Sequence, residues 1–521
     1  MPVLSLPLVN SSGEKRIWSG AFSAGLSLSI AEASQQHKGP ILVVASSARS
    51  ASQIESEISF FLGDKSKVSQ FPDWETLPYD QFSPHQDIIS QRLKILFSLP
   101  KKNSFVVVAP VMTMMHRLPP TSFFGARSFD YTVGDKLHLE DLRKKLQFSG
   151  YHLTNTVIER GEYNIRGSIV DIYPMGAPLP FRIDLFDDEI ESLRTFDPDT
   201  QLTKEKINRI FLLPAKEIPL DDESIKIFKR KWVERFDEDH RKCSIYSKVN
   251  SRIAPQGIEY FLPLFFEECS SIFEYLPKNC LVITENDVES SAQNFWESVK
   301  TRFEECNIDS KNPLLSPVEV FIPVSEFFGA LKKYPCIKIS AIKDNINETA
   351  KTFNLKFQPI PDISADNEAS SALVKLKNLL ASLSGRVLFC AETQGRKEAL
   401  SKILSSSEIE HLDVDNWKSF TDISEQICLT AYPIERGLYL KKPNILLVTE
   451  SELFGLKIIQ NRRRAKKIGR SEQAIKNLSE LNIGSPVVHI EHGVGRYLGL
   501  KNIDSEEWPQ EFLALEYADK A

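Results

Sequence analysis

The chain has 521 residues, of which 42% are hydrophobic and 26% are charged. This composition is typical of folded globular protein, and the length predicts several domains of about 100 to 200 residues each. The formal net charge of −6 excludes a general attraction to nucleic acid, because acidic protein and a polyanion repel each other. Seven cysteines, none in a C-x-x-C pair, and no apolar run long enough for a membrane span predict a cytoplasmic protein without a disulfide framework or a metal site.

The hydrophobic pattern changes along the chain and predicts a multi-domain α/β fold. Residues 1–124 alternate β-rich runs with helical apolar spacing, which predicts the first part of an α/β domain with parallel strands. Strands and turns predict a mainly β insert over 125–213, and residues 214–345 return to the mixed patterns of the first domain. A second small α/β domain is expected over 346–455. The last two segments are a basic linker and the start of a small β domain, at 456–480 and 481–521.

A glycine-rich segment near the start has the spacing of a phosphate-binding loop. Gly20, Gly25, Leu26 and Ser27 follow the pattern G-x-x-x-x-G-x-S before an expected helix. A functional loop needs lysine where this chain has Leu26, because that lysine binds the β- and γ-phosphates. We therefore expect a non-functional loop, and a turn of small residues that opens a helix is the simpler interpretation.

The insert contains a strand with an unusual polar face. In the run 181–186, strand alternation places Arg182 and Phe186 on the same side. Arg166, on a neighbouring run expected over 165–173, shares this side and is predicted beside Arg182. Arginine and aromatic residues on one exposed face are typical of a protein-binding site. The competing interpretation is that Phe186 lies under a loop and the arginines pair with nearby acids; the pattern alone supports both.

Two further segments imitate enzyme motifs. Asp237-Glu-Asp-His240 has the letters of a helicase D-E-x-H box, but a charged amphipathic run precedes it instead of a buried strand, so we interpret the match as chance. A group of acids could suggest a two-metal nuclease, although a solvated hairpin turn explains it more simply and no histidine or lysine is close in sequence. These acids are Asp184, Asp187, Asp188 and Glu189.

The end of the chain has two features of interest. His489 and His492 have a spacing that can suggest metal ligation, but no third ligand is evident, and neighbouring glycines favour bends in a small β barrel. The basic run 461–467 could contact phosphates, although such a run is more often a solvated surface. Because too few strands follow for a stable barrel, the natural protein is expected to continue beyond Ala521.

Five long blocks, spread over almost the whole chain, closely resemble the bacterial transcription-repair coupling factors. They are far more specific than a single glycine motif. The blocks are Asp73-Trp-Glu-Thr-Leu-Pro-Tyr-Asp80, Ser83-Pro-His-Gln-Asp-Ile-Ile-Ser90, Gly161-Glu-Tyr-Asn-Ile-Arg-Gly167, Arg182-Ile-Asp-Leu-Phe-Asp-Asp-Glu-Ile190 and Gly484-Ser-Pro-Val-Val-His-Ile-Glu-His-Gly-Val-Gly-Arg-Tyr497.

The resemblance implies an amino-terminal module similar to the excinuclease subunit UvrB, in which a helicase-like α/β domain is interrupted by an insert that binds UvrA. By motif match, Arg166, Arg182 and Phe186 fall on the UvrA-contacting positions. The family then has a small domain of undefined role and a Tudor-like domain that binds the β subunit of RNA polymerase. The candidate contacts for that subunit are Arg496, Tyr497, Leu498 and Leu500.

The resemblance also implies a motor that uses ATP and magnesium to translocate on DNA and displace stalled polymerase, and this chain ends before it. We therefore expect an adaptor without cofactor or catalytic residue, with weak or no DNA binding of its own. The alternative is an enzyme, either a nucleotide-dependent helicase or a metal-dependent repair nuclease.

Overall fold

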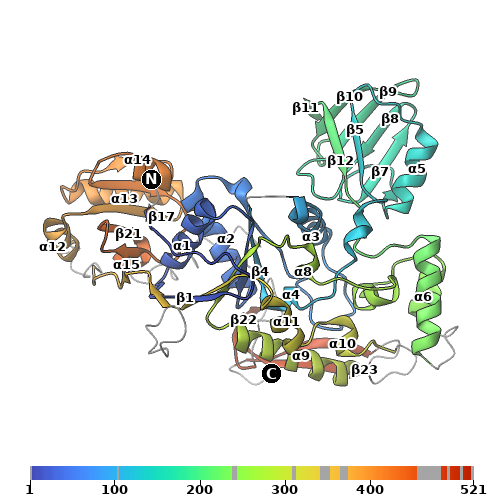
Figure 1. Cartoon of the computed structure of the whole chain (residues 1–521). Coiled ribbons are helices and arrows are strands. Elements are labelled where there is room, and N and C mark those ends of the chain that lie inside the picture. Colours follow the sequence, from blue (N-terminus) through green and yellow to red (C-terminus); the bar gives the residue numbers. More distant parts are fainter. Residues whose placement is uncertain are drawn as a thin grey trace.

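The structure is a computed structural model that describes residues 3–101, 105–236, 243–307, 313–340, 352–363, 373–454, 483–489, 493–504 and 509–517. The imitation helicase box at 237–240, the basic linker 456–480 and His492 lie outside these ranges. Within them, no helix combines the length and apolar character needed to cross a membrane. Figure 1 shows several separate sheets, in agreement with the multi-domain α/β prediction.

The core sheet has seven strands in the order β15-β1-β14-β13-β2-β4-β3, and every neighbouring pair is parallel. Strands β13 and β14 follow the insert in sequence, so two separate parts of the chain build one sheet. Strands β2 and β4 are completely buried, as expected for parallel strands covered on both faces. The strands are β1 Lys15–Ser19, β2 Ile41–Ala45, β3 Val68–Gln70, β4 Val106–Pro110, β13 Leu281–Glu285, β14 Cys336–Ser340 and β15 Thr352–Asn354.

The helices of the core domain follow the alternation expected from the sequence. Those before the insert are α1 Gly25–Gln36, α2 Ala48–Leu62, α3 Gln86–Ser98 and α4 Val111–Met114. Those after it are α6 Asp222–Arg235, α7 Ser244–Asn250, α8 Ile272–Tyr275, α9 Val288–Cys306, α10 Pro317–Val320 and α11 Val324–Leu331.

The first of the recognised blocks, residues 73–80, contributes to the core. Its Trp74 is buried beside Arg92 of α3, whose guanidinium carbon lies 5.2 Å from the indole ring and 4.6 Å from the Phe71 ring. Arg92 Nε also donates to Glu217 Oε1 at 2.7 Å, and both side chains are fully buried. Since Glu217 follows the insert in sequence and Arg92 precedes it, this ion pair links the two parts of the core domain.

The insert sheet has six strands in the order β11-β10-β9-β8-β7-β6. The sequence predicted one strand over 165–173, but the structure has two, because the chain reverses at Gly167, whose φ of 59° is in the left-handed region. The bounds are β6 His152–Leu153, β7 Glu162–Arg166, β8 Ile169–Ile172, β9 Phe181–Phe186, β10 Glu189–Phe196 and β11 Thr203–Ile207.

One face of the insert sheet packs on helix α5, Leu139–Phe148, which runs along it in Figure 1. The α5 side chains Leu142 and Leu146 are buried in the same apolar cluster as the strand residues Val170 and Ile183. At the base of the insert, β5 Phe129–Thr132 pairs antiparallel with β12 Arg209–Leu212. The chain therefore enters and leaves the insert side by side.

A second α/β sheet has the order β16-β20-β21-β17-β19-β18. Strands and helices alternate here, which agrees with the small α/β domain predicted from the sequence. β15 follows the predicted boundary at 346 and still pairs with β1 of the core sheet. The elements are β16 Phe357–Gln358, α12 Val374–Ser382, β17 Arg386–Ala391, α13 Gln394–Ser406, β18 Leu412–Asp413, α14 Trp417–Asp422, β19 Ile427–Ala431, β20 Leu438–Leu440, β21 Ile445–Thr449 and α15 Glu450–Phe454.

The last sheet is an antiparallel meander of β22, β23 and β24. The strands of this sheet agree with the small β domain predicted for the end of the chain. The bounds are β22 Pro486–His489, β23 Gly493–Asp504 and β24 Pro509–Glu516.

Candidate functional site: the open face of the insert sheet

The face of the insert sheet opposite α5 carries polar and charged side chains, and we call it the open face. Cross-strand pairing defines its rows: Asp171 is opposite Arg182, and Arg182 is opposite Arg194. In the next row, Ile169 lies between Arg166 and Asp184. The open face comprises Asn164, Arg166, Ile169, Asp171, Arg182, Asp184, Phe186, Glu189, Ser192, Arg194 and Lys206.

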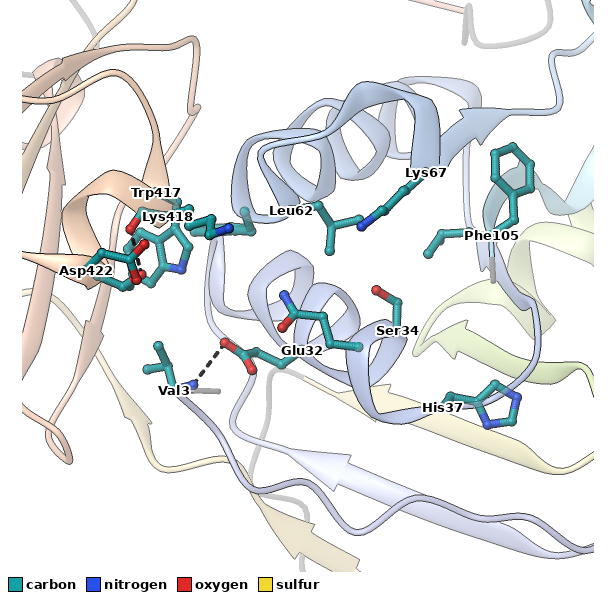
Figure 2. A pocket seen from close by; sticks show the side chains of 14 residues that line it. Val3, Glu32, Ser34, His37, Leu62, Lys67, Phe105, Trp417, Lys418 and Asp422 are labelled. Carbon is teal, nitrogen blue, oxygen red and sulfur yellow. Dashed lines mark hydrogen bonds between the residues drawn. The ribbon is translucent and has the colours of Figure 1, made fainter. Parts of the chain in front are cut away.

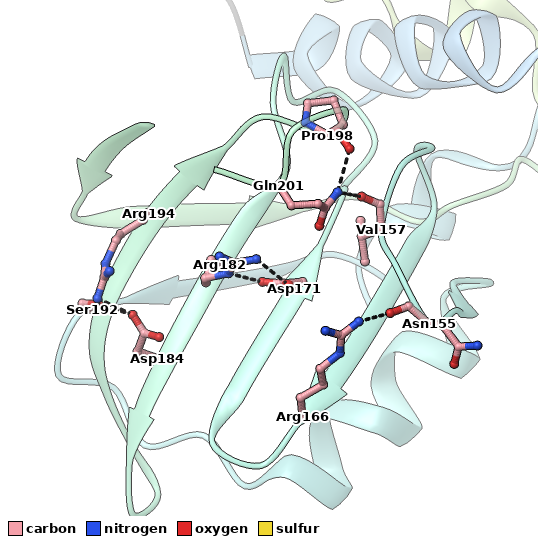
Figure 3. A network of polar contacts seen from close by, with 10 residues as sticks. All are labelled: Asn155, Val157, Arg166, Asp171, Arg182, Asp184, Ser192, Arg194, Pro198 and Gln201. Atoms are coloured by element: carbon pink, nitrogen blue, oxygen red, sulfur yellow. Dashed lines mark hydrogen bonds and ion pairs between the residues drawn. The ribbon is translucent and has the colours of Figure 1, made fainter. Parts of the chain in front are cut away.

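Arg182 is held firmly by its neighbours on this face. Its Nε and Nη2 donate to the two carboxylate oxygens of Asp171 at 2.7 and 2.9 Å, as Figure 3 shows. Its guanidinium carbon lies 4.9 Å from the centre of the buried Phe196 ring. The hydrogen bonds to Asp171 raise the pKa of Arg182. With only 22% of its side chain exposed, Arg182 already has its charged partner within the insert.

Arg194 is paired in the same way. Its Nη2 lies 2.7 Å from Asp184 Oδ2, and this oxygen also accepts from Ser192 Oγ at 2.7 Å (Figure 3). Asp171 and Asp184 therefore each neutralise one arginine of a neighbouring strand.

Arg166 has a different environment at the end of β7. Its guanidinium donates to the backbone carbonyl of Asn155, and its side chain is exposed (Figure 3). Within the described residues it has no ion pair. Arg166 therefore presents a positive charge that no carboxylate of the insert balances.

Phe186, at the end of β9, is the most exposed aromatic residue of this region. Its side chain is 76% exposed, which excludes the competing interpretation that a loop covers it. The residue opposite it on β10 is the exposed Glu189. A ring this exposed contributes little to the core of the insert, so its apolar surface is available to a partner.

Strand alternation placed the three predicted residues on the correct face but missed the strand between them. We expected Arg166 beside Arg182, but β8 lies between β7 and β9, and Asp171 occupies that place. Asp171 and Ile169 were not predicted on this face, because in the sequence their strand looks like a continuation of the preceding one. The turn residue Gly167 was the available signal.

The acidic turn between β9 and β10 does not form a metal centre. A histidine that is distant in sequence is nearby in space, because His138 Nδ1 lies 3.1 Å from Asp188 Oδ2. Nevertheless, within the described parts of the chain no three histidine, cysteine or acidic side chains are arranged to hold a metal ion. The positive φ of Asp187, 55°, fits the tight hairpin turn that was predicted.

The phosphate-loop segment is placed before α1 as its spacing requires, but its groups face inwards. The backbone N–H of Gly25 donates to Phe22 O at 2.9 Å instead of pointing into an anion site. Ser27 is buried, and its hydroxyl donates to Glu57 Oε2 at 2.6 Å. Burial raises the pKa of Glu57.

A ring from the second α/β sheet covers the same loop. A Cβ atom added to Gly25 would lie 2.9 Å from the ring of Phe357, and Leu26 packs in the surrounding apolar cluster. The space beside the second glycine is therefore filled by protein.

A cavity with a volume of about 500 Å³ lies elsewhere, between α1, α2 and α14 (Figure 2). It is lined by the last turn of α1, including Glu32, whose Oε1 accepts from the backbone N–H of Val3 at 3.0 Å. The twelve residues of α1 span about 18 Å, so this cavity is at the end of the helix away from Gly25. Phosphates bind at helix N-termini, and this position does not suit a nucleotide.

The candidate polymerase contacts on β23 do not share one face. Arg496 and Leu498 are exposed, whereas Tyr497 is buried between them. Arg496 Nη1 donates to Gly484 O at 3.4 Å. Leu500 belongs to the same strand, but its side chain is outside the described part of the structure.

Three family models match this chain. Residues 129–218 match the UvrB interaction domain, residues 380–453 match the MFD, D3 domain, and residues 481–521 match the CarD-like/TRCF RID domain. The insert with the open face lies within the first match. The fold and this match define a multi-domain α/β protein that carries a UvrB-type interaction domain.

Curated relatives identify the family. The transcription-repair-coupling factor of Escherichia coli (strain K12) is 37% identical over 511 residues, which cover 98% of this chain and 44% of that protein. The protein of the same name from Haemophilus influenzae is 37% identical over 95% of this chain, and that from Bacillus subtilis is 25% identical over 92%. The chain belongs to the transcription-repair-coupling factor family, and it spans less than half the length of these relatives.

Proposed function

We propose that this chain is an adaptor of transcription-coupled nucleotide excision repair, which recruits UvrA through the open face of the insert. In this proposal, Phe186 and Arg166 contact UvrA directly. Arg182 contributes mainly by shaping the face, because Asp171 already pairs with its guanidinium. The similarity of residues 129–218 to the UvrB interaction domain supports this assignment.

One observation carries the proposal: Phe186 is 76% exposed on the same sheet face as Arg166, which has no ion pair within the described residues. Exposed apolar rings beside charged groups are costly to leave in water and are frequent at the centres of protein interfaces. The core of the insert does not need this ring, because the opposite face supplies the buried side chains.

The test is the affinity of the chain for purified UvrA, measured by titration calorimetry. We expect Phe186→Ala to weaken binding by about 30-fold, the usual effect of truncating an interface anchor. Arg166→Ala should weaken it as well, and more strongly at low salt. Phe82→Ala is a matched control, because Phe82 is a 71% exposed phenylalanine outside the insert. Equal affinities of parent, Phe186→Ala and Arg166→Ala would refute the proposal.

We further propose that residues 481–521 belong to a Tudor-like domain that contacts the β subunit of RNA polymerase. The match to the CarD-like/TRCF RID domain supports this contact, and the exposed side chains of Arg496 and Leu498 are the best candidates for it. Tyr497 would act indirectly, by packing beneath the strand. Arg496→Ala and Leu498→Ala should weaken binding to the isolated β subunit, whereas Tyr497→Phe should leave it unchanged.

A related proposal is that these 521 residues have a helicase-like core that does not bind nucleotide. The buried Ser27, the internally bonded Gly25 amide and the Phe357 ring beside it support this view. ATP-driven translocation on DNA, which the resemblance implies for the full-length family protein, would then depend on another part of that protein. Magnesium-ATP should leave the melting temperature of this chain unchanged, because only a ligand that binds the native state raises it.

A further inference from the structure

Ile169 is an apolar residue in an unexpected place. It begins β8 on the open face, and 38% of its side chain is exposed. Its neighbour Val170 points to the other face and is completely buried. The core of the insert is therefore closed without Ile169, and the positions beside it in the same row are the charged Arg166 and Asp184.

Ile169 and Phe186 lie close together on the open face. Ile169 is directly opposite Asp184, and Phe186 is two residues further along the same strand. Diagonal neighbours of this kind are about 7 to 8 Å apart, which long and aromatic side chains can bridge. The backbone position level with Phe186 on the other side is Gly167, where an added Cβ atom would meet nothing within 4 Å. The backbone at Gly167 therefore leaves open space at this end of the open face.

Charges of opposite sign lie on the two sides of this apolar pair. Arg166 is beside Ile169, and Glu189 is beside Phe186. Neither forms an ion pair within the described ranges, in contrast to the pairs that Arg182 and Arg194 make. The apolar pair is thus bordered on one side by the positive charge of Arg166 and on the other by the negative charge of Glu189, which is opposite Lys136 in an isolated β-bridge. Complementary charges on a partner would fix its orientation on this face.

We propose that Ile169 is a second apolar anchor of the open face. An apolar side chain of UvrA would pack between Ile169 and Phe186, with a carboxylate facing Arg166 and a cationic side chain facing Glu189. This inference rests on the proposed function and adds a contact residue and a partner chemistry to it.

The test compares single variants of the complete 521-residue chain in UvrA binding. Ile169→Ala should weaken binding at least about 5-fold, the effect expected of a residue that contributes to an interface. Ile169→Thr should weaken it similarly, because threonine keeps the β-branched shape that suits a strand but offers a smaller apolar surface. Leu202→Ala is the matched control, because Leu202 is a 68% exposed apolar residue of the same insert beyond the far end of β10. It should change affinity less than 2-fold.

The possible outcomes separate the inference from the function on which it rests. Weaker binding by both Ile169 variants, with melting temperatures like that of the parent, would support it. If Ile169→Thr keeps the affinity of the parent for UvrA while Phe186→Ala binds weakly, Ile169 is not a second anchor, and the proposed function remains intact. Unchanged affinity of Phe186→Ala and Arg166→Ala would overturn both.

Discussion

The phosphate-loop segment and the open face are two candidate sites that differ in where their side chains point. At the loop, Ser27 and Leu26 face protein, and the ring of Phe357 covers Gly25. On the open face, Phe186 and Arg166 face outwards although they belong to a regular sheet. The comparison teaches that motif spacing alone does not establish a site, because the direction and burial of side chains decide what a partner can reach.

The largest expected effect contrasts two phenylalanines. Phe357→Ala should lower the free energy of unfolding by about 3 kcal/mol or more, because it leaves a cavity against Gly25 at a site that is only 3% exposed. Phe186→Ala should change it by less than about 0.5 kcal/mol, as is usual for surface positions. Urea denaturation followed by tryptophan fluorescence would measure both. Similar losses of unfolding free energy in the two variants would contradict the difference between the covered loop and the exposed ring of the open face.

A smaller effect is expected on the open face itself. Asp171→Ala should destabilise the chain by about 2 kcal/mol, because it leaves the partly buried guanidinium of Arg182 without its carboxylate. Glu191→Ala, at an exposed position in the bulge of β10, is the control and should be nearly neutral. Urea denaturation of both variants would test this. A neutral Asp171→Ala would mean that Arg182 is free to serve a partner directly.

Restoring the missing lysine should not restore the phosphate site. We expect Leu26→Lys to cost about 1 kcal/mol of stability, because a charge replaces a half-buried apolar group. It should also produce no change of melting temperature with magnesium-ATP, because Ser27 remains bonded to Glu57. Thermal denaturation with and without nucleotide measures both. A clear increase of the melting temperature with magnesium-ATP would show that only the missing lysine prevents the loop from binding nucleotide.

The stability contributions of a buried carboxylate beside the loop and of an exposed carboxylate of the insert should also respond to pH in opposite directions. Burial raises the pKa of Glu57 above 4.5, so its contribution to stability is complete below that pH and is lost as pH rises through the folded value. A hydrogen bond from Lys204 lowers the pKa of Asp197 to about 2 from 3.8, so its contribution is lost as pH falls from 3.8 towards 2.

Two variants can separate these contributions. Glu57→Gln should reduce the loss of stability above pH 4.5, and Asp197→Asn should reduce the loss below pH 3.8. Melting temperatures measured from pH 2 to 8 would test both slopes. Unchanged slopes in both variants would show that neither carboxylate has a shifted pKa in the folded chain.

Local patterns predicted the faces of the strands but not their order. The alternation in 181–186 placed Arg182 and Phe186 correctly because the period of two depends only on neighbouring residues. Strand β8 lies between β7 and β9 because the chain turns at Gly167. The hydrophobic pattern does not reveal this turn, since β-branched residues lie on both sides of it. For this reason Asp171 was not predicted as the partner of Arg182.

Contacts between distant segments were beyond any local pattern. The loop spacing could be recognised and the absence of lysine correctly noted, but the ring that covers Gly25 comes from Phe357, more than 300 residues later. The buried pair of Arg92 and Glu217 likewise joins segments on either side of the insert. Such pairings require a knowledge of sheet topology that composition and periodicity do not contain.

The pairing of β5 with β12 bears on how this protein could have arisen. Phe129 is opposite Leu212, so the two points where the insert joins the core are neighbours in space. A segment with adjacent ends can enter a gene at a single position without disturbing the sheet around it. The insert therefore has the geometry of a transferable cassette, and two repair proteins could share it by one recombination event while their host domains diverged.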